Sequence, residues 1–162
     1  MVEKGVAVCP TMNTACTHDN YFCPWDAREA VIGNLGAMRR AGITVVVGTD
    51  AGIGHCRFER YQDGLLAMAD AGFSNREIIA AATDRAAEVC RLQDVTGRLE
   101  AGLAADLAAF EGDPLQDIQA FARPRFVMAR GEEYRQQAIE PLQDLTEIKV
   151  QIMELLRKGA GV

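Results

Sequence analysis

The sequence is poor in features that would place it in several well-known classes of protein. It has no run of about 18 apolar residues, and its start, MVEKGVAVCP, has neither a basic segment nor a long apolar stretch. We therefore expect no membrane span and no signal peptide, and a cytoplasmic location. Positive charge is also scarce, since 17 lysines and arginines face 23 acidic residues. Because nucleic acids and anionic membranes attract positive surfaces, neither is expected as a partner.

Histidine and closely paired cysteines are scarce as well. The chain has two histidines, His18 and His55, and the five scattered cysteines Cys9, Cys16, Cys23, Cys56 and Cys90. An odd number of unpaired cysteines fits reduced thiols better than a disulfide framework. The first three cysteines are spaced by seven residues with His18 among them, so a zinc site made by these four residues can be considered. Structural zinc sites favour ligands two to four residues apart, so we expect the cysteines in and near the first strand to be small buried hydrophobes.

Two segments have the pattern of short strands. Residues 6 to 11, VAVCPT, are apolar up to Pro10, which cannot donate to a sheet ladder. Residues 43 to 47, ITVVV, are β-branched without alternation, which is typical of a parallel strand covered on both faces by helices. The two strands are expected to belong to one parallel sheet.

Three helices are expected around these strands. The first runs from a capping-box-like pair, Asp26 and Glu29, to about Arg40; the second covers residues 57 to 71; the third starts at the capping box Ser74 and Glu77 and continues to about Cys90. Gly42 and Gly72 would end the first two helices, because glycine readily adopts the left-handed conformation that follows a helix. The middle of the chain is thus strand, helix, strand, helix, helix.

The residue pattern of the sequence changes after Val95. Glycines and short apolar pieces predict short strands, with the best candidates at residues 105 to 110 and 125 to 130. Asp106 and Asp113 are interpreted as turn and packing residues. Residues 137 to 158 have helical spacing of leucine and isoleucine, which indicates a packing face or an oligomer seam.

Asp50 is the first candidate for chemistry. It follows the buried strand directly, in VVVGTDAG, where α/β proteins place their functional groups. Gly48 and Gly52 would let the backbone turn and let a ligand or metal approach closely. The alternative interpretation is that Asp50 only caps the turn that follows.

An ordered series of motifs resembles a known family. VVVGTDAG is similar to the last barrel strand of the amidohydrolase superfamily, and the segments from IIAAATDRAAEVC to VTGRLEAGLAADLAAFEGDPLQDI resemble the following helix and the return into a small β-domain. The resemblance covers roughly residues 5 to 130 and is closest to the imidazolonepropionase-like and prolidase-like branch. Its specificity comes from the order and spacing of the motifs, since GTDAG alone would be weak.

The resemblance implies a (β/α)8 barrel that holds one or two divalent metals, usually zinc, at the C-terminal ends of its strands. Asp50 matches the aspartate that touches the metal, takes a proton from the attacking water and returns it to the leaving nitrogen. His55 resembles a histidine that contacts substrate in some members; its alternative is an exposed loop residue. The implied substrate is a small molecule with an amide, cyclic amide or dipeptide bond.

The expected fold class is α/β, as a C-terminal fragment of such a TIM barrel. Residues 1–95 would carry the last two strands with their helices, residues 96–135 part of the small β-domain, and residues 136–162 a C-terminal helix. The family's other metal ligands have no counterpart here, and a catalytic zinc ordinarily takes three protein ligands. The isolated chain is therefore expected to be inactive, and either a homo-oligomer or the complement of a missing N-terminal part.

Two other functions fit parts of the pattern. A non-catalytic α/β module could persist by oligomerising, because association would cover its open sheet edges. A small-ligand or nucleotide-binding domain could be built around VVVGTDAGIG. The second alternative lacks the GxGxxG and GxxxxGK[ST] signatures, and the charge of Asp50 would repel a phosphate.

Overall fold

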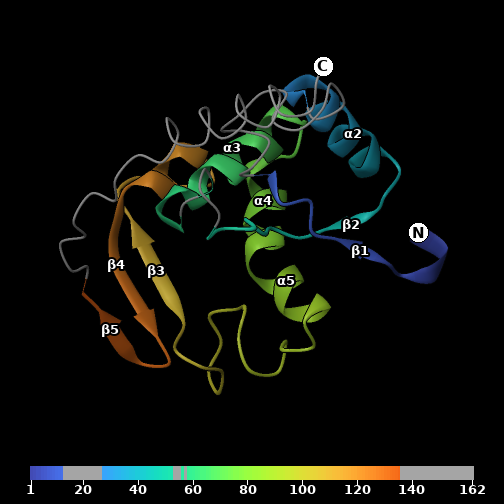
Figure 1. Ribbon diagram of the computed structural model, residues 1–162. Coiled ribbons are helices and arrows are strands. Elements are labelled where there is room, and N and C mark those ends of the chain that lie inside the picture. Colours follow the sequence, from blue (N-terminus) through green and yellow to red (C-terminus); the bar gives the residue numbers. More distant parts are fainter. Residues whose placement is uncertain (13–26, 53–55, 57, 136–162) are drawn as a thin grey trace, which may run out of the picture.

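The computed structural model describes residues 1–12, 27–52, 56 and 58–135 of the 162-residue chain (Figure 1). The described helices and strands are, in order, η1 (Val2–Lys4), β1 (Ala7–Val8), α2 (Arg28–Arg40), β2 (Thr44–Val45), η3 (Phe58–Arg60), α3 (Tyr61–Asp70), α4 (Asn75–Ala82), α5 (Asp84–Val89), β3 (Leu107–Phe110), η4 (Ile118–Ala122), β4 (Pro124–Ala129) and β5 (Glu132–Tyr134). The fold is mixed α/β, as expected. None of the helices in these ranges is long and apolar enough to cross a membrane.

β1 and β2 form a parallel pair joined through α2. Ala7 pairs with Thr44 and Val8 with Val45, and the amide of Val46 donates to the carbonyl of Val8 at 3.0 Å. The expected parallel arrangement is confirmed, but each strand is shorter than its apolar run. The next amide, that of Val47, donates to the carbonyl of Ala81 near the end of α4.

The two glycine stops are confirmed. α2 ends at Arg40 with Gly42 at φ 72°, and α3 ends at Asp70 with Gly72 at φ 90°. The start of α2 differs from the expectation. Its N-cap is Ala27, which makes no side-chain capping bond, so the helix begins one residue later than a capping box at Asp26 requires.

α4 begins with the expected capping box. The Ser74 hydroxyl accepts a hydrogen bond from the Glu77 amide at 3.3 Å, and the Ser74 amide donates to Glu77 Oε2 at 2.8 Å. The bidentate pair between Arg39 and Glu77 then ties α4 to the end of α2. Arg39 also lies over the Phe73 ring, 5.6 Å from its centroid.

The expectation of one helix from Ser74 to Cys90 is wrong. The helix breaks at Thr83, where φ is −130° and ψ is −102°, and α5 starts at Asp84. Both residues bond to nearby backbone: Thr83 Oγ1 donates to the Ile79 carbonyl at 2.7 Å, and Asp84 Oδ1 accepts from the Arg85 amide at 2.9 Å. Such local bonds compete with the helical ladder and explain the break.

The second half of the described chain holds an antiparallel sheet in the order β3-β4-β5. β3 and β4 confirm the two expected strands, whereas β5 was not expected. The turn before it consists of Arg130 and Gly131, with φ values of 52° and 83°, between the paired residues Ala129 and Glu132. Positive φ at both central residues is what a tight type I′ hairpin requires.

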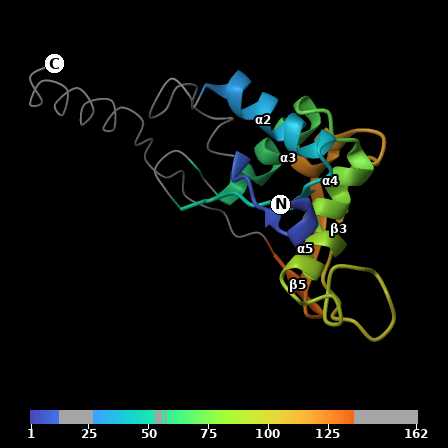
Figure 2. The same cartoon turned by 90° about the vertical axis from the view of Figure 1, so that its right-hand side faces the viewer.

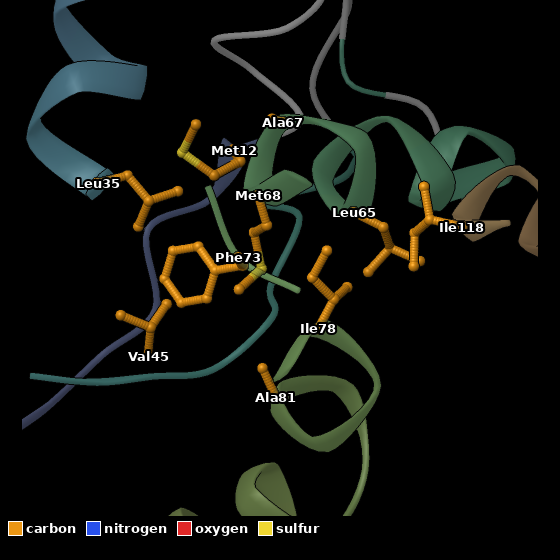
Figure 3. Packing of buried hydrophobic residues seen from close by; sticks show 10 residues of the cluster. All are labelled: Met12, Leu35, Val45, Leu65, Ala67, Met68, Phe73, Ile78, Ala81 and Ile118. Atoms are coloured by element: carbon orange, nitrogen blue, oxygen red, sulfur yellow. The ribbon is translucent and has the colours of Figure 1, made fainter. Parts of the chain in front are cut away.

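The buried core lies mainly in the first half of the chain (Figure 3). Its members are Met12, Leu35, Val45, Leu65, Ala67, Met68, Phe73, Ile78, Ala81 and Ile118. Ile118 from η4 packs beside Leu65 of α3 and is the member that ties the second half to this core. The boundary expected near residue 95 stays a prediction, and the helix expected at residues 137 to 158 lies outside the described residues.

The sheet β3-β4-β5 lies on one side of α4 and α5, and the β1–β2 pair lies on the other (Figure 1). Seen from the N-terminal side, α4 and α5 stand in front of this sheet (Figure 2). Between them is an open cavity of about 1330 Å³, lined by residues of α4, α5, β3 and β4 and by the loop between Leu92 and Leu99.

Candidate functional site

Asp50 lies just beyond the C-terminal end of β2, on the loop after the parallel pair. Its side chain is exposed and its φ is +55°, the left-handed region that non-glycine residues seldom adopt. The carboxylate makes no hydrogen bond or ion pair with another described residue. It is thus available to a ligand at the open end of the strands, the position the sequence predicted.

The loop that carries Asp50 is closed by hydrogen bonds from its neighbours. The amide of Ala51 donates to Thr49 Oγ1 at 3.1 Å, and the amide of Gly52 donates to the Cys56 carbonyl at 3.0 Å. The Cys56 thiol donates to the Thr49 carbonyl at 3.0 Å. Asp50 is therefore placed by backbone contacts on both sides of it.

Gly48 has a specific steric role at the end of β2. A Cβ at this position would lie 2.1 Å from Cys9 Sγ, so any larger residue would require the Cys9 thiol to move. The expected approach of a ligand or metal to Gly48 stays a prediction. The expectation that Cys9 is a small buried hydrophobe is wrong, because this residue is exposed beyond the end of β1.

Other candidate residues lie outside the described part of the chain. His55, expected to contact substrate, and His18, Cys16 and Cys23, considered as zinc ligands, belong to segments that the structure does not describe. The role of His55 stays a prediction. Among the described cysteines, Cys9 and Cys90 are exposed and Cys56 is buried.

The described residues do not by themselves fit a catalytic zinc. Among them, no group of three or more histidine, cysteine, aspartate or glutamate side chains is close enough to share a metal ion. A catalytic zinc takes three protein ligands and an open position. Asp50 could supply one carboxylate oxygen, so the remaining ligands would have to come from elsewhere.

Asp106 holds the β-region together, as its interpretation as a packing residue predicted. Its two carboxylate oxygens accept hydrogen bonds of 2.7 Å, one from Thr96 Oγ1 and one from the Arg130 amide. These bonds, with that from Thr96 the stronger cause, lower the pKa of Asp106 below its usual value. Asp113 closes a turn by accepting from the Leu115 amide at 2.9 Å.

Comparison with known proteins gives a consistent family assignment. The model of the amidohydrolase family matches residues 2–133. An ochratoxinase of Aspergillus niger is 36% identical over 89 residues, which is 54% of this chain and 18% of that protein. The match therefore spans less than a fifth of this relative.

Several solved structures superpose on most of the chain. A Xaa-Pro dipeptidase with methionine bound in its active site has a TM-score of 0.70 at 25% identity, covering 84% of this chain and 36% of its own. A putative prolidase from Bifidobacterium longum has a TM-score of 0.71 at 25% identity, with 90% and 39% covered. The A. niger ochratoxinase structure has a TM-score of 0.63 at 24% identity, with 87% and 34% covered. The chain spans less than two fifths of each.

Proposed function

Since this chain belongs to the amidohydrolase family, we propose that it supplies the C-terminal end of a metal-dependent hydrolase barrel that cleaves a carbon–nitrogen bond. The bond would be that of an amide, a cyclic amide or a dipeptide. Likeness to a Xaa-Pro dipeptidase and to an ochratoxinase supports this substrate class. The observation that carries the proposal is the exposed Asp50 carboxylate beyond the parallel strands, which has no partner among the described residues.

Asp50 is proposed as the residue that moves the proton. A carboxylate at this position can accept a proton from the attacking water and later return it to the leaving nitrogen. The left-handed backbone at Asp50 supports the role, because strained conformations of this kind gather at functional sites. His55, five residues along the same loop, is proposed to contact the substrate.

Zinc or another divalent metal is proposed as the cofactor, with Asp50 as one ligand. Such a metal, when bound, polarises a carbonyl and lowers the pKa of a water molecule. Because the described residues do not include the other ligands, we propose that they come from polypeptide that supplies the remaining barrel strands. The 162-residue chain is accordingly proposed to be inactive on its own.

The open cavity supports a need for additional polypeptide. It lies between α4, α5 and the β3-β4-β5 sheet, and the loop beside it exposes Val95 by 52% and Leu99 by 84%. Apolar surface of this kind usually marks an interaction site. The complementary part of the barrel would cover it, and self-association of the chain is the alternative that the same surface favours. A non-catalytic module that oligomerises would have this surface too, but would make no use of Asp50.

The first test is metal content and activity in matched samples. The 162-residue chain, purified with zinc and dialysed, is expected to retain close to no zinc, to hydrolyse no dipeptide or N-acyl amino acid, and to self-associate in sedimentation. One zinc per chain that survives the Asp50→Asn substitution would contradict the proposed site. Such a result would require a metal site built elsewhere in the chain.

The second part uses the chain fused to, or expressed with, the polypeptide that completes the barrel. There Asp50→Asn is expected to lower kcat by about 10²- to 10⁴-fold, because general acid–base catalysis contributes that much. Asp70→Asn on α3 is the matched control, since Asp70 is also exposed and its ion pair with Arg28 lies on the surface, where such pairs contribute little. Full activity of the Asp50→Asn variant would exclude Asp50 from the chemistry.

A further inference from the structure

The loop around Asp50 is fastened by one buried residue, Cys56. Its side chain is 1% exposed. Its thiol donates to the carbonyl of Thr49 at 3.0 Å, and its own carbonyl accepts from the amide of Gly52 at 3.0 Å. The two bonds reach positions on either side of Asp50, so a single residue constrains both ends of the segment that presents the carboxylate.

Asp50 cannot hold this position through its own side chain. The carboxylate has no partner among the described residues, and a φ of +55° is unfavourable for a residue with a Cβ. Such a conformation persists only where the surrounding structure enforces it. The described contacts that can enforce it are those of Thr49 and Gly52, and both lead to Cys56.

We propose that Cys56 is a positioning residue for Asp50, whose thiol fixes the Thr49 carbonyl while its backbone fixes the Gly52 amide. The proposal rests on the proposed function only for the catalytic role of Asp50. The hydrogen bonds that fix the loop are observed independently of that role. Cys56 would touch neither substrate nor metal. Its effect on catalysis would pass entirely through the direction of the Asp50 carboxylate.

The side chain of Cys56 can be changed without removing the backbone bond. Cys56→Val keeps a small apolar side chain but has no donor, so the Thr49 carbonyl loses its partner in a partly buried setting. Cys56→Ser restores a donor on a small side chain. Cys90, the exposed thiol that caps α5, provides the control substitution Cys90→Ala.

The test is nuclear magnetic resonance on the full 162-residue chain. The Cα and Cβ shifts of Asp50 report its left-handed conformation, and amide exchange at Ala51 and Gly52 reports loop opening. In Cys56→Val we expect exchange at these two amides to quicken about five- to tenfold, the effect of one net hydrogen bond. The Asp50 shifts should move toward unstructured values, and Cys56→Ser should reverse most of both changes.

Amide exchange in α4 distinguishes a positioning role of Cys56 from a general effect on stability. The amides of this helix should exchange at the same rate in all variants, and Cys90→Ala should change nothing. Unchanged Asp50 shifts in Cys56→Val would overturn the proposal. So would an equal rise in exchange throughout α4, because Cys56 would then be only a core residue.

The completed enzyme supplies an independent readout. Cys56→Val should lower kcat while leaving KM within about twofold, since substrate contacts are untouched and only transition-state interactions are lost. If the wild-type enzyme hydrolyses no carbon–nitrogen bond, the proposed function fails, yet the resonance measurement still decides whether Cys56 holds the loop. If hydrolysis occurs and Cys56→Val retains full kcat, the positioning role fails alone.

Discussion

The two halves of the described chain differ in how completely they bury their apolar side chains. In the first half, α2, β2, α3 and α4 meet around side chains such as Val45 and Ile78, which are 1% and 0% exposed. In the second half, none of the strand residues in β3, β4 or β5 is fully buried. The first half therefore supplies most of the buried core, to which η4 of the second half adds Ile118, while the strands of the second half stay partly exposed.

The difference indicates which part of the described chain further polypeptide would contact. The core comes mainly from α2, β2, α3 and α4, and β2 and α3 are the elements that flank the Asp50 loop in the sequence. Within the described part of the chain, the sheet β3-β4-β5 and the cavity beside α5 leave apolar side chains partly or largely exposed. Assembly with further polypeptide should therefore change the second half more than the first.

The largest expected effect comes from the buried core. Ile78→Ala should lower the free energy of unfolding by about 2–5 kcal/mol, because it leaves a cavity among fully buried neighbours. Leu99→Ala, at a side chain that is 84% exposed, should change it by no more than about 0.5 kcal/mol. Urea denaturation followed by circular dichroism measures both. Comparable losses in the two variants would show that the second half is as closed as the first.

Much of the first half could be predicted because its signals are local. The Ser74 and Glu77 capping box is written in four consecutive residues and forms as expected. Gly42 ends its helix by its own conformational freedom. The β-branched run before Asp50 marks a covered parallel strand, and that pattern placed Asp50 at the end of the strand without any tertiary information.

The features that escaped prediction depend on contacts that helix or strand periodicity does not encode. The break at Thr83 lies where the turn at Gly97 packs, and helical periodicity cannot reveal that contact. The thiol of Cys9 lies against Gly48, which is distant from it in the sequence. The Cys56 contact to Thr49 joins residues outside the described helices and strands, where no periodicity applies. The Arg130–Gly131 turn is an exception, since its glycine was a visible signal for a hairpin.

A smaller effect is expected at the junction between the two halves. A Cβ on Gly97 would lie 2.6 Å from the Cβ of Ala87 on α5, whereas one on Gly102 would meet nothing within 4 Å. Both glycines have φ near +100°, so alanine strains the backbone similarly in each. Gly97→Ala should therefore cost about 1–3 kcal/mol more than Gly102→Ala, which is the cost of overpacking. Equal losses of stability for the two variants in thermal unfolding would mean that α5 shifts at little cost and that the two halves are only loosely joined.

The smallest effect compares ion pairs from the two halves through their pH dependence. The hydrogen bonds from Arg39 hold the pKa of Glu77 at about 2 instead of 4.5, whereas the pair of Arg125 and Glu111 on the sheet is more than half exposed on both sides. Because the folded-state pKa is lowered, the unfolded chain takes up the proton first as pH falls from about 4.5 toward 2, and stability is lost in that window. With Glu77 itself about one-third exposed, the loss should be only about 1 kcal/mol.

Glu77→Gln should remove this part of the acid-dependent loss measured by urea denaturation at pH 6 and pH 3, while Glu111→Gln should leave it intact. If the two substitutions behave alike, the pair between α2 and α4 is no better ordered than one on the open sheet, and the contrast between the halves does not extend to their charged groups.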